Sequence, residues 1–159
     1  MTRAQTEAAC AADGIDFWTD PHNSDPRFTR ARVRHTVLPL LEQELGPGVA
    51  ETLARTAELL RPDMQALDDL ADLAFLEARS GDGLVIAALA EQPEAVRTRV
   101  LRLAALAAGS PRAELFHVHV RALDGLTRGR VRGEVQLPGH VTAARDGGHL
   151  RFRPTAPLG

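Results

Sequence analysis

The chain has 159 residues, of which 44% are hydrophobic, and this is enough apolar material for one folded domain or two small ones. Its formal net charge at pH 7 is −2. No apolar run approaches the roughly 20 residues that cross a bilayer, and the polar N-terminal stretch lacks the apolar core of a signal peptide. We therefore expect a soluble, cytoplasmic protein with no membrane partner.

The charge is unevenly distributed along the chain. All 19 basic residues are arginines. Residues 1–80 contain eight arginines against 14 acidic residues, a balance of −6, and residues 81–159 contain 11 arginines against seven acidic residues, a balance of +4. This asymmetry predicts an anionic partner for the second half.

The first predicted elements are helical. A short helix is expected over residues 3–12, followed by an extended segment and loop over residues 15–26, where two aspartate-proline pairs disfavour helix. From Phe28 apolar residues recur every four positions and predict a helix, which Pro39 should break or restart near Leu38.

The sequence GPG at residues 46–48 marks a boundary before a long helix or helix pair. Apolar residues at spacings of four and three form one stripe along it: Leu53, Ala57, Leu60, Met64, Leu67, Ala71, Ala74 and Ala78. Pro62 should kink or divide this element, and its acidic outer face is typical of a solvated surface. The segment SGDG at residues 80–83 is the best candidate for a hinge into a second unit.

The second unit begins with the apolar run LVIAALA, which predicts a strand or a buried turn. A helix is expected from Pro93 to Ala108, with its core face at Val96, Val100, Leu103 and Ala107. Ser110 and Pro111 predict the N-cap and first residue of another helix, with Leu115, His119, Ala122 and Leu126 directed inward.

From Gly133 onward the apolar period changes to two, and turns are expected at residues 138–139 and 146–148. This pattern predicts two or three antiparallel strands. The predicted fold is therefore α+β and mostly helical: an N-terminal helical segment and long linker helices, followed by a small domain of helices with a short antiparallel hairpin or sheet.

No motif in the sequence supplies a catalytic centre. The six histidines have no spacing typical of metal ligands, and G-x-S-x-G, Walker and GxGxxG sequences are absent. We therefore expect neither a catalytic residue nor a metal site on this chain.

The stretch DPRFTRARVRH concentrates arginines instead. On a helix Arg27, Arg30 and Arg34 share one face, and like charges so close together repel unless an anion or an acidic side chain lies among them. Two interpretations are open: these guanidinium groups bind phosphate, or Asp20 and Asp25 fold back onto Arg30 or Arg34 as ion pairs.

Arginines of the second half allow two similar interpretations. Arg99 and Arg102 lie one turn apart, outside the expected core face of their helix, and so can follow a nucleic-acid backbone. Solvent-exposed arginines scattered without a ligand would produce the same pattern.

The stretch DFWTDPHNSDPRFTRARVRHTVLPLLE resembles a motif of the tRNA(Ile)-lysidine synthetases, ATP-dependent ligases that attach lysine to the wobble cytidine of an isoleucine tRNA. The matching residues are Asp20, Pro21, Asn23, Asp25, Arg30, Val33, Arg34, Leu38 and Pro39. His22 and Ala31 depart from the family pattern, which has Ser or Thr and often Asn at these positions. The later segments AVRTRVLRLAALAAG, HVRALDGL and VQLPGHVTAARDGGHLRF are similar to the family's small substrate-binding domain.

The family's adenylating motifs, SGGxDS and HHxDDQxET, do not occur in this sequence. The resemblance therefore implies the C-terminal part of such an enzyme, with residues 1–45 ending an ATP-pyrophosphatase-type catalytic domain, 46–80 as a helical linker and 81–159 as a tRNA-binding domain. ATP and Mg²⁺ are implied for the full-length enzyme, whereas this chain is expected to bind no cofactor and to be inactive alone.

The resemblance also implies the roles of particular residues. Those expected near ATP phosphates or tRNA are Asp20, Asn23, Arg30, Arg32 and Arg34. Those expected to bind tRNA are Arg97, Arg99, Arg102, Arg112 and Arg121.

The partners that the resemblance implies are the isoleucine tRNA and the N-terminal catalytic domain. A second copy of the chain is also expected, because such a fragment exposes apolar surface that its missing partner would cover. The alternative function is a freestanding nucleic-acid-binding module, or a helical dimerisation module that uses the stripe from Leu53 to Ala78, in either case without catalysis.

Overall fold

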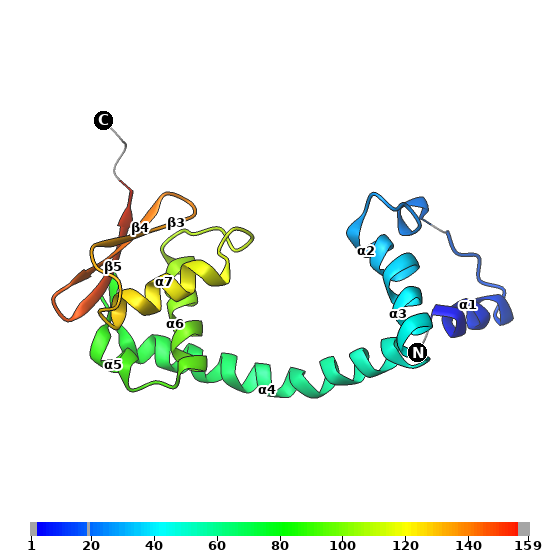
Figure 1. The fold of residues 1–159 in the computed structure, drawn as a ribbon, viewed down its shortest axis with the longest axis horizontal. Helices are drawn as coiled ribbons and strands as arrows, with labels where there is room; N and C mark the ends of the chain where they lie inside the picture. The colour runs from blue at the N-terminus through cyan, green and yellow to red at the C-terminus, as the bar shows by residue number, and fades with distance from the viewer. Residues whose placement is uncertain (1–2, 19, 156–159) are drawn as a thin grey trace. The chain divides into compact units, whose positions relative to one another are not determined.

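The computed structural model describes residues 3–18 and 20–155. The chain divides into two compact units, Met1–Glu58 and Leu59–Gly159. The units combine long helices with a small antiparallel sheet, so the predicted α+β, mostly helical fold is confirmed (Figure 1).

The first unit is helical in its described part. Its elements are α1 (Arg3–Ala12), the 3-10 turn η1 (Pro21–Asn23), α2 (Thr29–Arg32), the π-helical segment η2 (Val33–Val37), α3 (Leu38–Leu45) and the start of α4 (Val49–Ala78). The π-helical segment lies directly before α3, where Pro39 occupies the first turn and has no N–H to donate. The prediction that Pro39 restarts the helix near Leu38 is confirmed.

Helix α4 is a single helix of 30 residues with Pro62 inside it, so the predicted long helix is confirmed and is not divided. Its N-terminus is capped by Glu42, whose carboxylate accepts hydrogen bonds from the backbone N–H groups of Gly48 at 2.6 Å and Ala50 at 2.8 Å. Of the predicted apolar stripe, the C-terminal alanines (Ala71, Ala74 and Ala78) are buried, but Leu53, Leu60 and Met64 are exposed. Only the last part of the stripe therefore belongs to the core.

The second unit contains the end of α4 and a sheet with helices. Its further elements are β1 (Arg79–Ser80), β2 (Gly83–Val85), α5 (Ile86–Ala90), α6 (Glu94–Ala107), α7 (His117–Thr127), β3 (Glu134–Leu137), β4 (Val141–Asp146) and β5 (His149–Pro154). The five strands form one antiparallel sheet in the order β1-β2-β5-β4-β3. The two predicted turns are confirmed, since they join β3 to β4 and β4 to β5.

The core of this unit lies between α6, α7, the end of α4 and the sheet. Leu101 of α6, Leu123 of α7 and Leu150 of β5 are each completely buried. Burial of a leucine side chain contributes about 1.5–3 kcal/mol. The apolar side chains that alternate along the last strands therefore pack toward these two helices.

Two predicted boundaries in the second unit are wrong. Residues 80–83 are no hinge, because Ser80 pairs with Gly83 in the β1–β2 hairpin. Ser110 and Pro111 start no helix, because α7 begins only at His117. The intervening turns are held by Arg102, which donates hydrogen bonds to the carbonyls of Leu115 and, at 3.4 Å, Arg112.

Helix α6 forms close to its predicted limits, and Val96 and Val100 are buried as predicted, but the other two predicted core positions are not. Ala107 is exposed and Leu103 only half buried, whereas Leu101 and Ala104 are buried together with Arg97. From the sequence, Arg97 was expected to bind tRNA and was not expected in the core. None of the helices within the described ranges is long and apolar enough to cross a membrane.

Replacing Gly139 by alanine is expected to destabilise the second unit. This glycine has a φ of +79°, and an added Cβ would lie 2.7 Å from Pro111 Cδ and 2.8 Å from the carbonyl oxygen of Gly109. We expect a loss of about 2–4 kcal/mol in the free energy of unfolding, measured by urea denaturation. Gly133→Ala is the matched control, because Gly133 has a φ of +83° with nothing within 4 Å of the added atom. Equal losses in the two variants would show that the contact with the Pro111 turn costs nothing.

Candidate nucleic-acid interface

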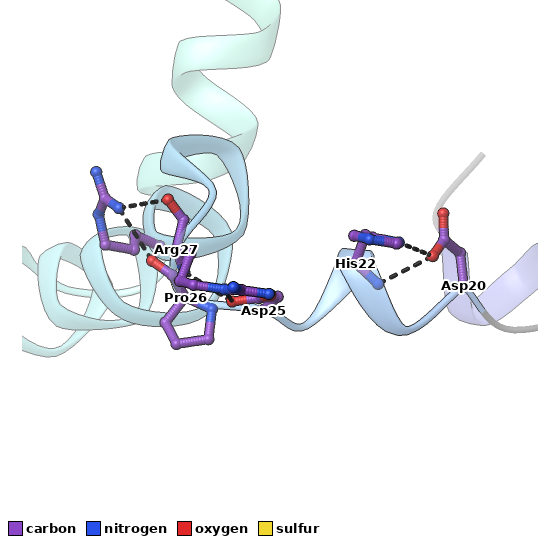
Figure 2. A network of polar contacts seen from close by, with 6 residues as sticks. Asp20, His22, Asp25, Pro26 and Arg27 are labelled. Carbon is purple, nitrogen blue, oxygen red and sulfur yellow. Dashed lines mark hydrogen bonds and ion pairs between the residues drawn. The ribbon is translucent and has the colours of Figure 1, made fainter.

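In the loop at residues 20–27, both aspartates form hydrogen bonds with residues of the same loop (Figure 2). Asp20 accepts a hydrogen bond from the backbone N–H of His22 at 2.9 Å and lies 2.8 Å from its Nδ1. Asp25 accepts from the backbone N–H of Arg27 at 2.9 Å and from the Arg27 guanidinium at 2.7 Å and 2.9 Å. The prediction that these aspartates fold back onto Arg30 or Arg34 is therefore wrong, because short-range partners two residues away satisfy them.

These contacts change the pKa of both carboxyl groups. The backbone hydrogen bond from His22 lowers the pKa of Asp20 below its ordinary value of 3.8, and the guanidinium of Arg27 does the same for Asp25. A lowered pKa in the folded state means that the contacts stabilise the loop above pH 3.8 and are lost as the pH falls through the lowered value. At neutral pH both aspartates are ionised and engaged.

Arg32 is also engaged within its own loop. Its guanidinium donates to the carbonyls of Pro26 at 2.9 Å and Arg27 at 3.0 Å, and to Thr29 Oγ1 at 3.1 Å. Arg32, predicted to lie near phosphate, thus holds the turn that precedes α2. Among the described residues Arg30 and Arg34 have neither a hydrogen bond nor an ion pair through their side chains, and both are exposed.

The predicted residue Asn23 lies in η1, apart from this pair of arginines in sequence. Its backbone carbonyl oxygen accepts a hydrogen bond from Nε2 of His35 at 3.0 Å, and this contact joins η1 to η2. The first cluster of predicted site residues is thus reduced to two free guanidinium groups, Arg30 and Arg34, four residues apart on a continuous helical segment.

In the second unit Arg97 is part of a buried ion pair. Its Nε donates to Asp124 Oδ1 at 2.6 Å and its Nη1 to the carbonyl of Gln92 at 2.7 Å, and the side chains of Arg97 and Asp124 are 5% and 8% exposed. Arg130 donates to the other oxygen of Asp124 at 3.1 Å. The structure therefore gives Arg97 an interior position in place of the surface position predicted for it.

Arg99 and Arg102 are engaged as well. Arg99 pairs with Asp68 of α4 at 2.7 Å and donates to the carbonyl of Ala95 at 2.9 Å. Arg102 is bound to the turns before α7, as described above. Both therefore hold elements of the second unit together, and their contact with an RNA backbone stays a prediction.

The other two predicted tRNA contacts remain at the surface. Arg112 is exposed, and within the described ranges its side chain has no partner. Arg121 lies 3.9 Å from Glu94, with both side chains more than 60% exposed, and such a pair is worth little.

A further cationic surface of this unit lies outside the predicted site residues. We call residues 127–133, with sequence TRGRVRG, the arginine loop. Its arginines are Arg128, Arg130 and Arg132, and all three are exposed. Arg145 lies beside it, because its Nη1 donates to the carbonyl of Thr127 at 3.5 Å. Three arginines at alternate positions, flanked by glycines, were the available sequence signal.

The arginine loop is built on the end of α7. The backbone N–H groups of Arg130 and Val131 both donate to the carbonyl of Gly125, at 2.8 Å and 3.0 Å, so the chain folds back over the helix. Val131 packs so closely that a Cβ on Gly125 would lie 2.7 Å from it. Because Val131 is directed inward, the arginines on either side of it remain at the surface.

The position of these arginines after the end of α7 is electrostatically favourable even when no ligand is bound. Cations at the C-terminus of a helix interact favourably with its dipole, which stabilises by about 0.3–1 kcal/mol. The side chains of Arg128 and Arg132, however, have no hydrogen-bond partner or ion pair among the residues that the structure describes. They are therefore free to bind an anion without breaking an internal contact.

The described part of the chain contains no group of three histidine, cysteine, aspartate or glutamate side chains that could hold a metal ion. The groups available for binding are thus guanidinium groups, which recognise phosphate and carboxylate oxygens.

Comparisons with known proteins match the chain to one family. Residues 84–151 match a family model described as the TilS substrate binding domain. The chain is 48% identical over 155 residues to the tRNA(Ile)-lysidine synthase of Streptomyces coelicolor, covering 96% of this chain and 44% of that protein. It is 49% identical over 152 residues to the enzyme of Thermobifida fusca, covering 94% and 47%, and 51% identical over 152 residues to that of Mycolicibacterium paratuberculosis, covering 91% and 47%. The chain thus spans about half the length of these relatives.

Proposed function

The chain belongs to the tRNA(Ile)-lysidine synthase family, and from this premise we propose that it forms the C-terminal half of such an enzyme, in which it binds and positions the tRNA substrate. The observation that carries the proposal is the arginine loop. It lies inside the segment that matches the substrate-binding domain, and two of its guanidinium groups have no partner within residues 3–18 and 20–155.

The proposed mode of binding is phosphate contact rather than base reading. A-form RNA stems present phosphates and 2′-hydroxyl groups, and proteins recognise them mainly by shape and charge. The loop is held against α7 by two backbone hydrogen bonds to Gly125, so its arginines start from a fixed backbone. Less conformational entropy is then lost when RNA binds.

We assign the chemistry to the half of the enzyme outside this chain. ATP and Mg²⁺ would be held there, because this sequence contains no glycine-rich phosphate loop and its described residues offer no metal-binding group. Arg30 and Arg34 of the first unit are proposed to lie near phosphate of ATP or tRNA in the whole enzyme.

Apolar side chains of the first unit fit the same assignment. Trp18 is 78% exposed, and Phe17, Phe28 and Leu45 are also exposed. Aromatic side chains in such positions are typical of surfaces that another domain covers. We propose that the catalytic half of the enzyme packs on them.

Binding of the 159-residue chain to isoleucine tRNA and to a non-cognate tRNA, measured by filter binding between 50 and 200 mM salt, tests the proposal. If about three phosphates are contacted, affinity should fall by roughly 20- to 40-fold across this range. A preference for the isoleucine tRNA would show that the chain contributes to substrate choice. Affinity that is absent at 50 mM salt, or independent of salt, would contradict a tRNA-binding role.

A second candidate function is dimerisation through α4. The exposed side chains of Leu59, Leu70, Leu73 and Leu76 favour it. Sedimentation at several protein concentrations, with and without tRNA, separates the two candidates. Dimerisation alone predicts a mass that depends on concentration and is indifferent to RNA, whereas the proposed function predicts co-sedimentation with tRNA.

A further inference from the structure

A pocket in the second unit contains the inner side of the buried arginine. It is lined by Ile86, Ala90, Arg97, Thr127 and Arg128, and its volume is about 260 Å³. At about 30 Å³ per water molecule this is room for several waters, and therefore for a phosphate group. The buried Arg97 and the exposed Arg128 of the arginine loop therefore line the same pocket.

The donors of Arg97 are only partly used. Its Nε and Nη1 bind Asp124 and the carbonyl of Gln92, while Nη2 has no partner among the described residues. Among the described residues, the hydroxyl of Ser110 is the only side-chain polar atom that is both inaccessible to solvent and without a hydrogen bond, so Arg97 Nη2 is not such an atom. Nη2 of Arg97 must therefore meet solvent although its side chain is only 5% exposed, and the pocket is the cavity that Arg97 lines.

The charges around the pocket favour an anion. Arg97, Arg128 and Arg130 oppose one carboxylate, Asp124, which leaves a balance of +2. Both oxygens of Asp124 are already engaged by Arg97 and Arg130. The apolar walls formed by Ile86 and Ala90 lower the local dielectric constant, so the remaining positive charge acts more strongly than it would in water.

The C-terminal carbonyls of α7 would repel an anion, but they are occupied. Backbone N–H groups of the arginine loop donate to the carbonyls of Asp124, Gly125 and Leu126, and Arg145 donates to that of Thr127. Asp124 and Gln92 also fix the orientation of the Arg97 guanidinium in advance, so little side-chain entropy remains to be lost on binding.

We propose that this pocket binds a phosphate group, with Arg97 Nη2 and the Arg128 guanidinium donating hydrogen bonds to its oxygens. The inference rests on the proposed function where that phosphate belongs to the tRNA backbone. A free small molecule that carries a phosphate offers the same chemistry, and the experiment separates the two sources.

The test is a titration of the 159-residue chain with inorganic phosphate, followed by ¹H–¹⁵N NMR at constant ionic strength with chloride as the replacement salt. The Nε–H resonance of Arg97 and the backbone amide of Thr127 should shift and saturate. Arg128→Ala should weaken phosphate binding by about tenfold, because a charge-assisted hydrogen bond is lost while the fold is kept. Arg153→Ala is the control, since Arg153 is an exposed arginine of the same unit that is paired with Glu134 and does not line the pocket, and it should leave the phosphate affinity unchanged.

Identical shifts with chloride and phosphate, or equal weakening by the two variants, would show that Arg97 and Asp124 form only a structural ion pair and would overturn the proposal.

Isoleucine tRNA added to the phosphate-saturated chain then identifies the source of the phosphate group. Displacement of phosphate assigns the pocket to the RNA backbone, and retention of phosphate while tRNA binds assigns it to a small molecule. If phosphate binds but tRNA does not, the phosphate pocket is supported and the proposed function is rejected. If tRNA binds but phosphate causes no shifts, the proposed function is supported and the phosphate pocket is rejected.

Discussion

Asp124→Ala is expected to lower the free energy of unfolding of the second unit by about 3–5 kcal/mol. Asp124 is 8% exposed and its partner Arg97 is 5% exposed, so the substitution leaves a guanidinium charge inside the protein without a counter-ion. It also removes the hydrogen bond from Arg130. For a unit of about 100 residues each kcal/mol corresponds to a shift of about 4–8 °C in Tm, so thermal and urea unfolding followed by circular dichroism will both detect the loss.

The matched control is Asp146→Ala. Asp146 accepts a hydrogen bond from Arg151 at 2.9 Å, but its side chain is 70% exposed, and a surface pair of this kind contributes less than about 1 kcal/mol. The double variant Arg97→Met/Asp124→Leu should recover most of the lost stability, because a buried ion pair can be replaced by apolar side chains of similar volume at little cost. A similar small loss for Asp124→Ala and Asp146→Ala would contradict the assignment of Asp124 as the buried counter-ion.

The triple variant Arg128→Ala/Arg130→Ala/Arg132→Ala is expected to weaken tRNA binding by roughly 100-fold at 50 mM salt, at on the order of 1 kcal/mol for each phosphate contact. The slope of log affinity against log salt should become shallower by about 2 to 3, because each lost contact removes about 0.7–0.9. Filter binding over a range of salt measures both quantities. Circular dichroism should show that the variant stays folded, since all three side chains are exposed.

The control for this variant is Arg151→Ala/Arg153→Ala. Both arginines are on β5 and are already paired, Arg151 with Asp82 and Asp146 and Arg153 with Glu134 at 2.6 Å. Their removal deletes positive charges that are already paired with carboxylates, so the tRNA affinity should change by less than about threefold. If this double variant and the triple variant weakened binding equally, tRNA binding would depend on overall charge, and the arginine loop would lose its assigned role.

Local patterns in the sequence were sufficient for most elements. The helix predicted from Pro93 to Ala108 is α6, Glu94–Ala107, and the predicted turns at Pro138-Gly139 and residues 146–148 join the last three strands. Periodicity and glycine positions act within a few residues, so they can be read without knowing the fold. Ser110-Pro111 is one exception, and the hinge expected at residues 80–83 is another. The capping signal of Ser110-Pro111 was outweighed by hydrogen bonds from Arg102, which belongs to a different helix.

Partners of the arginines depend on contacts between distant parts of the chain. Arg97 binds Asp124 at a separation of 27 residues, and Arg99 binds Asp68 at a separation of 31. No short-range pattern indicates such pairs. The aspartates at 20 and 25, which did look like distant partners, are satisfied within two residues.

The sequence by itself determined that the chain is mostly helical with a terminal antiparallel sheet, that its second half carries the positive charge, and which family it resembles. Only the tertiary structure decided which guanidinium groups are free. An arginine on a helix is buried, paired or exposed according to the surface packed against it, and that surface comes from other elements. Folding therefore engages Arg97, Arg99 and Arg102 inside the second unit, and leaves the loop after α7 to present its arginines to an anion.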